Sequence, residues 1–313
     1  MYRHSILKDR KSALLFMVLA SGVASFSGLL IRNIQSASPD QINIYRSIFF
    51  TAVVTLGFAI RNKKSFSNKS GYLNPPVIWA SLCLGATGLL VPYALTMTTI
   101  ANNAFAMSAT PFISMFLAFV FLGERISRAT LIAMAFASGG IILMIFDGLG
   151  RGTTTGDVLA ILVAIGFSTF AVILRANKDL EMTPCLFGAG LIVIAGSIIS
   201  NNDGYAISQH DLILCLIWGS VLSGIVHWIF VIAAKYLLAS ELTLFTLFEF
   251  ALAPAWVWIF LSEKPENMAL VGGSIVICSV GIRALAELFR QQQKITYAQI
   301  NQSPDSCLNA KRK

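Results

Sequence analysis

The 313-residue chain is poor in charged residues. Asp, Glu, Lys and Arg make up only 12% of it, about half of the roughly 25% that is usual in a soluble domain. Hydrophobic residues make up 56%. This composition excludes an ordinary soluble domain. The net charge of +8 does not indicate nucleic-acid binding, because the basic residues stand at the ends of apolar stretches, where membrane orientation accounts for them.

Motifs for metals, cofactors and covalent catalysis are also missing. The five cysteines are scattered, odd in number and without a C-x-x-C spacing, so they predict neither a disulfide framework nor a zinc site. The chain has no phosphate-binding loop, no H-E-x-x-H and no G-x-S-x-G, the motifs of familiar nucleotide and hydrolase chemistry. We therefore expect no enzyme, no bound metal and no cofactor, and any driving force should come from a gradient.

Ten apolar stretches occupy most of the chain. The first, residues 12–31, holds no Asp, Glu, Lys or Arg and has the length that a hydrocarbon core of ~30 Å requires of a helix. The others are residues 41–60, 77–100, 103–122, 129–146, 158–174, 184–200, 212–234, 242–261 and 268–286. In lipid each segment must satisfy its own backbone, and these lengths suit helices better than barrel strands. The prediction is an all-α integral membrane protein with ten transmembrane helices.

The basic residues predict the orientation of these helices. Lys and Arg in short loops favour the cytoplasmic side of a membrane. With the N-terminus inside, 18 of the 23 basic residues fall on the inner side. Only Arg32, Arg151 and Lys264 fall outside, and Arg46 and Arg283 lie within helices. We expect both termini in the cytoplasm.

The two halves of the chain resemble each other. The loop after the fourth stretch, residues 121–125, reads FLGER, and the loop after the ninth, residues 260–264, reads FLSEK. The first and sixth stretches also correspond, with Arg32 matching Arg175. This predicts five-helix repeats in residues 1–150 and 151–290 and a cytoplasmic tail in 291–313. Because five is odd, the second repeat is inverted, as in transporters that expose one central site alternately to either side.

Residues in both halves also follow the pattern of a known family. The first half has Tyr93, Ala94, Leu95, the run 101–104, Pro111, Leu122, Gly123, Glu124, Arg125, Gly139 and Gly140. The second half has Leu238, Ala239, Glu249, Pro254, Leu261, Ser262, Glu263, Lys264, Pro265, Gly272, Gly273 and Gly281. In order, spacing and duplication these residues resemble the EamA-type ten-helix transporters of the drug/metabolite transporter superfamily.

The resemblance implies a carrier of the cytoplasmic (inner) membrane for small polar metabolites, most often amino acids or related compounds leaving the cell. An importer or exchanger of a nucleotide-linked or methyl-donor metabolite is the alternative on the same fold. A membrane interaction protein without transport activity is an alternative of another class. The expected partners are a small-molecule substrate and membrane lipid, and the sequence leaves a homodimer open.

Three polar residues inside the apolar stretches are candidates for substrate binding. A charged side chain at mid-bilayer costs roughly 2.5–3.5 kcal/mol on insertion scales, so one that is retained requires a partner, a cavity or a function. Glu249 either binds an ammonium group, carries a proton or forms a structural hydrogen bond. Arg46 either holds a carboxylate or snorkels to the headgroups. His227 either switches charge near neutral pH or is a neutral histidine bonded between helices.

Aromatic and amide side chains complete the predicted site. We expect Tyr93 and Trp228 to form walls of a cavity at the interface of the two halves, near the middle of the membrane. Asn102 and Asn103 are expected to supply hydrogen bonds to an organic ligand. The alternative for the aromatic rings is packing against lipid or other helices.

Three prolines and two glutamates have a predicted gating or structural role. Pro92, Pro111 and Pro254 each remove a backbone hydrogen bond within an apolar stretch, which either bends a helix or frees a carbonyl toward a cavity. Glu124 and Glu263 stand at loop edges, where they either brace the loops or take part in conformational gating.

Overall fold

The computed structural model describes residues 9–61, 73–98, 100–145, 153–261 and 267–301. Within these ranges the chain forms helices, turns and loops, and no strand occurs. Six of the described helices are long and apolar enough to cross a membrane: Arg10–Asn33, Pro39–Ile60, Pro75–Met97, Asn102–Leu122, Thr154–Ala176 and Gln209–Ala233. Arg128–Met144, Pro184–Ser200 and Leu270–Ala286 are shorter apolar helices. The fold class is that of an all-helical integral membrane protein, as the composition predicts.

The helices follow one another in this order. In the first half they are α1 (Arg10–Ala24), α2 (Ser27–Asn33), α3 (Pro39–Arg61), α6 (Pro75–Met97), α7 (Ile100–Ser108), α8 (Thr110–Leu122) and α9 (Arg128–Ile145). In the second half they are α10 (Thr154–Ala176), α11 (Pro184–Ser200), α12 (Gln209–Ile217), the π-helix η2 (Trp218–Ile225), α13 (Val226–Ala233), α14 (Ala239–Leu261) and α15 (Asn267–Asn301).

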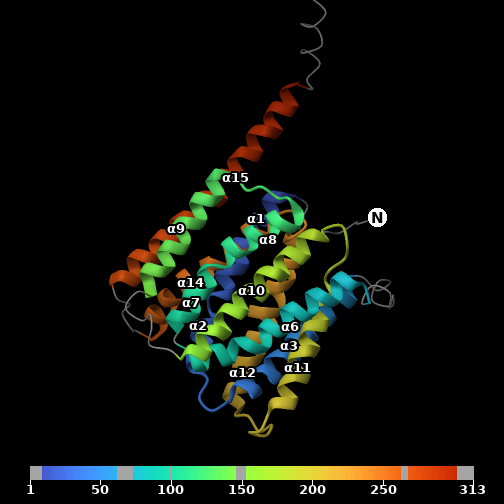
Figure 1. Ribbon diagram of the computed structural model, residues 1–313, viewed down its shortest axis with the longest axis vertical. Helices are drawn as coiled ribbons and strands as arrows, with labels where there is room; N and C mark the ends of the chain where they lie inside the picture. The colour runs from blue at the N-terminus through green and yellow to red at the C-terminus, as the bar shows by residue number, and fades with distance from the viewer. Residues whose placement is uncertain (1–8, 62–72, 99, 146–152, 262–266, 302–313) are drawn as a thin grey trace, which may run out of the picture.

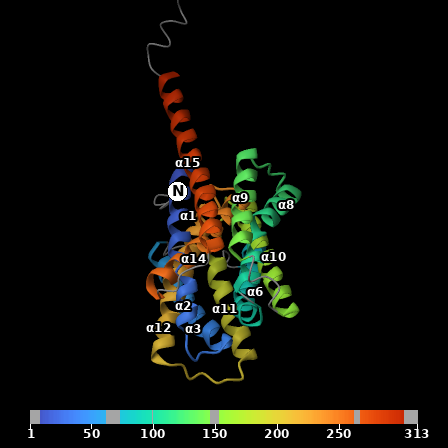
Figure 2. The same cartoon turned by 90° about the vertical axis from the view of Figure 1, so that its left-hand side faces the viewer.

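These helices pack as an elongated bundle (Figure 1). Helix α6 lies between α10 and α11, its most extensive neighbours, and α3 packs against α11 and η2. Helices α9 and α15 lie side by side at one edge. The end of α15 projects beyond the bundle, at the end where α1 begins (Figure 2). Segments from both halves of the sequence therefore interleave throughout the bundle.

Two apolar stretches that read as single helices are interrupted in the structure. The first breaks at Ser25 and Phe26, between α1 and α2. The fourth breaks at Ala109, and Pro111 then occupies the first turn of α8, where its missing N–H costs no hydrogen bond. The other two predicted breakers, Pro92 and Pro254, lie inside the continuous helices α6 and α14.

The eighth stretch contains the π-helix. Its eight residues include Gly219, where a Cβ atom would collide with the backbone carbonyl of Arg46. The absence of a side chain thus allows η2 to approach α3 closely. Such π-helical turns are often found at functional sites, and this one lies against the helix that carries Arg46.

Large apolar side chains occur both inside and outside the bundle. Phe170, Phe230 and Phe245 are almost fully buried, and the rings of Phe170 and Phe230 stack with centroids 5.9 Å apart. On the outside, Ile199 and Phe121 are 86% and 73% exposed. Exposure of this kind would be costly in water at about 25 cal/mol per Å², but it costs nothing against lipid tails.

A charged network joins four helices at the end where α1 begins. Glu241, in the first turn of α14, accepts hydrogen bonds from Arg10 of α1 at 2.7 Å and from Arg283 of α15 at 2.8 Å. Arg283 also donates to the hydroxyl of Thr130 on α9 at 3.0 Å. Glu241 and Arg283 are both buried, so each charge is neutralised without water.

We predict that Gly140→Ala destabilises the protein by about 1–3 kcal/mol, the usual cost of overpacking. A Cβ atom at Gly140 would lie 2.7 Å from the carbonyl oxygen of Gly272 and would force α9 and α15 apart. The neighbouring Gly139 has open space around its Cβ position, so Gly139→Ala serves as the matched control. Thermal unfolding in detergent should show a lower midpoint for Gly140→Ala only; equal midpoints for the two variants would contradict this packing.

Candidate functional site

The clearest candidate site is a small cavity around Arg46. Its volume is about 60 Å³, enough for one small polar group or one or two waters. It is lined by Arg46, Ser47, Phe50, Leu84, Gly88, Ala189, Gly190, Val193, Ser223 and His227. These residues come from α3 and α6 in the first half and from α11, η2 and α13 in the second. The cavity therefore lies where the two halves of the chain meet.

Arg46 has unused hydrogen-bonding capacity in this cavity. Its Nη2 donates to the Asn43 side-chain oxygen and to the Gly88 carbonyl, both at 3.1 Å. The guanidinium carbon lies 5.0 Å from the ring centroid of Trp218, within range of a cation–π interaction. Its Nε is buried and has no hydrogen-bond partner. No carboxylate of the described residues pairs with this guanidinium, so the site retains an uncompensated positive charge.

His227 lines the same cavity from the opposite half of the chain. Its Nδ1 lies 2.8 Å from the Ser223 carbonyl oxygen. A carbonyl only accepts, so Nδ1 carries the proton and Nε2 of a neutral ring is left as an acceptor. The rings of Phe50 and Phe167 meet the imidazole edge-on at 6.0 and 6.5 Å. The structure thus brings Arg46 and His227 together, 181 residues apart in sequence.

The two predicted aromatic walls lie elsewhere. The ring of Trp228 fills the space that a side chain at Gly57 would occupy, and its indole N–H is buried without a partner. Tyr93 donates its hydroxyl to Asp40 at 2.6 Å, and Ser200 donates to the same carboxylate oxygen at 2.7 Å. Tyr93 therefore ties α6 to the start of α3 and the end of α11. Neither ring is among those that line the Arg46 cavity.

Glu249 lies at the break between α1 and α2. Its Oε1 accepts a hydrogen bond from the Ser27 hydroxyl at 2.8 Å, and its second oxygen has no partner among the described residues. Beside it, the Trp256 indole donates to Ser25 at 2.6 Å and stacks on Phe26 at 4.3 Å. These contacts hold the interrupted helix against α14. Discontinuous helices of this kind often form ligand sites in transporters, but Glu249 does not line the Arg46 cavity.

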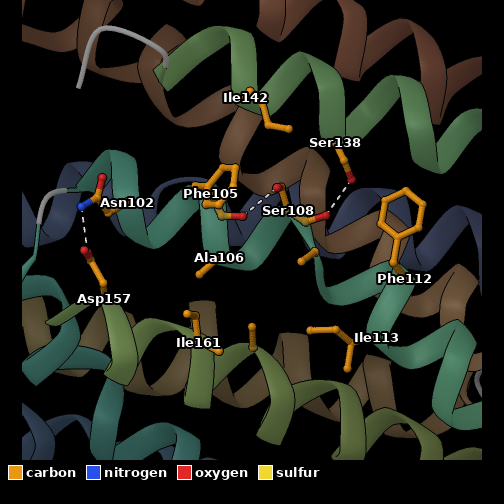
Figure 3. A pocket seen from close by; sticks show the side chains of 12 residues that line it. Asn102, Phe105, Ala106, Ser108, Phe112, Ile113, Ser138, Ile142, Asp157 and Ile161 are labelled. Atoms are coloured by element: carbon orange, nitrogen blue, oxygen red, sulfur yellow. Dashed lines mark hydrogen bonds between the residues drawn. The ribbon is translucent and has the colours of Figure 1, made fainter. Parts of the chain in front are cut away.

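A second, larger cavity of about 460 Å³ lies between α7, α8, α9 and α10 (Figure 3). It is lined by Asn102, Phe105, Ala106, Ser108, Ala109, Phe112, Ile113, Ser138, Ile142, Asp157, Ile161 and Ala164. Of the two predicted amide residues, Asn102 lies at one end of this cavity, whereas Asn103 is buried and lines neither cavity.

Asp157 is a polar residue of this cavity that the sequence analysis missed. Its Oδ1 accepts hydrogen bonds from the Asn102 amide at 2.8 Å and from the Thr98 hydroxyl. Hydropathy placed Asp157 one residue before an apolar stretch, as an ordinary acidic residue near a helix N-terminus. The structure starts α10 earlier, at Thr154, and so brings the carboxylate inside the bundle. The available signal was Thr153, a residue type that favours the N-cap, five positions before the apolar stretch.

The predicted gating residues lie at the ends of the helices. Glu124 accepts a hydrogen bond from the Arg175 Nε at 2.6 Å, and Arg175 also donates to the carbonyls of Ala234 and Lys235. This joins the loop after α8 to the ends of α10 and α13. Glu263 falls outside the described residues. Among the residues that the structure describes, no cluster of His, Cys, Asp and Glu has the composition of a metal site.

Comparison with known proteins agrees with this fold. Residues 11–146 match the model of the EamA-like transporter family. The probable terminal-alkyne amino-acid exporter of Streptantibioticus cattleyicolor is 28% identical over 228 residues, covering 69% of this chain and 76% of the exporter. This match and this relative support an EamA-type transporter of the drug/metabolite transporter superfamily.

A crystal structure provides a separate comparison for the fold of this chain. It matches 88% of the chain and 97% of its own length with a TM-score of 0.75. The sequence identity is only 13%, so the likeness concerns the fold alone. The similar fold extends well beyond residues 11–146 and covers most of both halves of the chain.

We predict that Glu249→Leu leaves the stability of the transporter unchanged or raises it. A single hydrogen bond from Ser27 compensates little of the desolvation cost of a carboxylate, and apolar replacements of such groups are often neutral or stabilising. The matched control is Glu241→Leu on the same helix. It leaves Arg10 and Arg283 without their shared partner and should cost about 3–5 kcal/mol. The measurement is thermal unfolding of both variants; a comparable loss in each would assign Glu249 a structural role.

Proposed function

We propose that this protein exports amino acids or related small polar metabolites across the cytoplasmic membrane by alternating access. The family supports a transporter, and the similarity to a protein named as an amino-acid exporter supports both the direction and the substrate class. Arg46 is the residue that we propose binds the substrate. Its buried guanidinium has a free Nε in a cavity shared by the two halves, which suits the carboxylate of an amino acid.

The size of the Arg46 cavity limits what it can hold in this conformation. At about 60 Å³ it admits a carboxylate group but not a whole amino acid. The remainder of the substrate requires the surrounding helices to separate. A transporter that moves between two arrangements provides such a change. The whole substrate is then bound in an arrangement in which these helices lie farther apart than they do here.

The packing of the helices supports ten crossings in two inverted repeats. In an inverted repeat, spans one to five correspond to spans six to ten, so each contact between two spans should have a counterpart between the corresponding spans. The contact of α6 (span three) with α10 (span six) has its counterpart in the contact of α13 (span eight) with α1 (span one). In the same way, the contact of α6 (span three) with α11 (span seven) has its counterpart in the contact of η2 (span eight) with α3 (span two). Three further contacts map onto themselves: α3 with α11, α8 with α14, and α9 with α15. This pairing is what a pseudo-twofold axis in the membrane plane requires.

Glu249 is the proposed second charge in transport. Its free carboxylate oxygen can bind the ammonium group of the substrate or carry a coupling proton. Glu249→Gln separates the two roles. Loss of gradient-driven accumulation with exchange intact indicates a proton carrier, and loss of both indicates an ammonium site; normal transport by inserted protein would exclude Glu249 from either.

We predict that Arg46→Met lowers the transport rate by at least about 100-fold and that Arg46→Lys lowers it about tenfold. The first removes the charge, and the second keeps the charge but loses the fork geometry. Counterflow of single radiolabelled amino acids into proteoliposomes provides the measurement, and net efflux from cells gives the direction. Arg128→Met, at an exposed position where α9 begins, should remain within about twofold. Counterflow of no amino acid by the unaltered protein would contradict the proposed substrate class.

We predict that reporter fusions at Lys64, Asp203 and the C-terminus report inside, outside and inside. The reason is the excess of basic residues in the segments proposed to be cytoplasmic. Paired cytoplasmic and extracytoplasmic reporters at each position provide the measurement. An external C-terminus would contradict both the even number of crossings and the inverted repeat.

A further inference from the structure

The larger cavity is separate from the Arg46 cavity. The two share no lining residue, and their polar groups differ in sign. At about 460 Å³, the larger cavity falls within the range of about 300–1,000 Å³ that is typical of small-molecule sites. It therefore has room for a complete organic ligand in the present conformation.

Asp157 gives one end of this cavity a negative charge. Its Oδ1 is occupied by Thr98 and Asn102, which fixes the carboxylate in place. Its Oδ2 has no partner among the described residues and is not buried from solvent. The described lining contains no Lys, Arg or His. The charge at this end therefore favours a cation and disfavours an anion.

The hydroxyl groups farther along the cavity do not change this preference. Ser138 donates to the Ser108 carbonyl at 2.6 Å, and Ser108 donates to the Phe105 carbonyl at 2.7 Å (Figure 3). Both hydroxyl protons are thus already used within the protein. A ligand carboxylate would find no free donor there, whereas an ammonium group finds the open carboxylate oxygen of Asp157.

The rest of the cavity is apolar and open at the side of the bundle. Phe105, Phe112, Ile113, Ile142 and Ile161 extend into it from three sides (Figure 3). Phe105 and Ile161 are about half exposed, at 47% and 50%. Because neighbouring exposed side chains on α9 and α10 are also apolar, this opening faces the hydrocarbon region. A ligand with a hydrocarbon body can reach the cavity from the membrane.

We propose that this cavity binds a small amphipathic primary amine, with its ammonium group on the free oxygen of Asp157 and its hydrocarbon body between α7, α9 and α10. The site is independent of the amino-acid export assigned to the Arg46 cavity. The same ammonium chemistry occurs in the ethanolamine headgroup of lipids. We propose a small amine and not a lipid as the occupant, because the cavity offers one charged group and one continuous apolar space, which match a single ammonium group with one hydrocarbon chain.

The test compares three ligands of equal chain length: hexylammonium, hexanol and hexanoate. Their binding to the full-length protein is measured by calorimetry in phosphatidylcholine nanodiscs, with empty nanodiscs subtracted. Hexylammonium should bind at least about tenfold more tightly than either of the others, because only it gains a charge-assisted hydrogen bond. Equal affinities, or preference for hexanoate, would overturn the proposal. Loss of hexylammonium binding when phosphatidylethanolamine is added would make the lipid the occupant, which also overturns it.

Two pairs of variants locate the site. Asp157→Asn should lower hexylammonium affinity at least about tenfold, to that of hexanol, and Asp203→Asn, an exposed acid in the loop after α11, should leave it within twofold. Ile161→Trp should weaken all three ligands by filling the opening. Ile165 lies one turn along α10, where it is exposed and does not line the cavity. Ile165→Trp should therefore leave the affinity for all three ligands unchanged. If Asp157→Asn fails to fold, the two tryptophan variants still test the location of the site. Equal effects of Ile161→Trp and Ile165→Trp on ligand binding would place the binding site elsewhere and contradict the proposal.

Discussion

The absence of water in the interior of a bilayer is the constraint on which this structure depends. A buried polar atom must find its partner within the protein or remain costly. Glu241 satisfies this requirement fully, with hydrogen bonds from Arg10, Arg283 and the Leu238 amide. Arg46 and Glu249 do not, since each keeps an atom without a partner. Buried atoms of Glu124 and Trp228 also lack partners, so an unsatisfied group points to a ligand only where it also lines a cavity, as Arg46 does.

The same constraint explains the positions of small residues. Lipid tails are as apolar as leucine, so helices in a membrane associate through close packing more than through hydrophobic burial. Gly140 and Gly272 allow α9 and α15 to meet backbone to backbone, and Gly219 does the same for η2 and α3. The second of these contacts holds η2, which supplies Ser223 to the smaller cavity, against α3, which supplies Arg46. The close approach that stabilises the bundle therefore also builds the wall of its smaller cavity.

Hydropathy predicted the elements of this fold well, because burial in lipid imposes a strong and local requirement on sequence. The stretch 184–200 coincides with α11, and 41–60 lies within α3. The interruption at Ser25 and Phe26 could not be predicted, since it depends on contacts with Trp256 and Glu249 on α14. The π-helix depends in the same way on the fit of Gly219 against α3.

The candidate sites were less predictable than the helices, for a related reason. Arg46 and Glu249 are conspicuous in sequence because each is a charge within an apolar run. Which polar groups share a cavity is decided by packing between distant helices, so Arg46 meets His227 while Glu249 and Trp228 lie elsewhere. Asp157 stands at a stretch boundary, where an acid is unremarkable by hydropathy, and only its contacts with Thr98 and Asn102 show that it faces a cavity.

Buried carboxylates also hold the bundle at both of its ends. Glu241 ties four helices where α1 begins, and at the opposite end Asp211 accepts the backbone amides of Gln35, Ser36 and Ala37 in the loop between α2 and α3. The partners of Glu241 are full charges, whereas those of Asp211 are mainly backbone amides. For the alternating access proposed above, one set of bonds must open while the other holds. Separating Glu241 from Arg10 and Arg283 breaks the pairing of three charges, whereas separating Asp211 from the backbone amides of its loop leaves one charge unpaired. The Asp211 end is therefore the less costly one to open, and a substrate held at Arg46, which lies in the half of α3 nearer to that end, has the shorter way out through it.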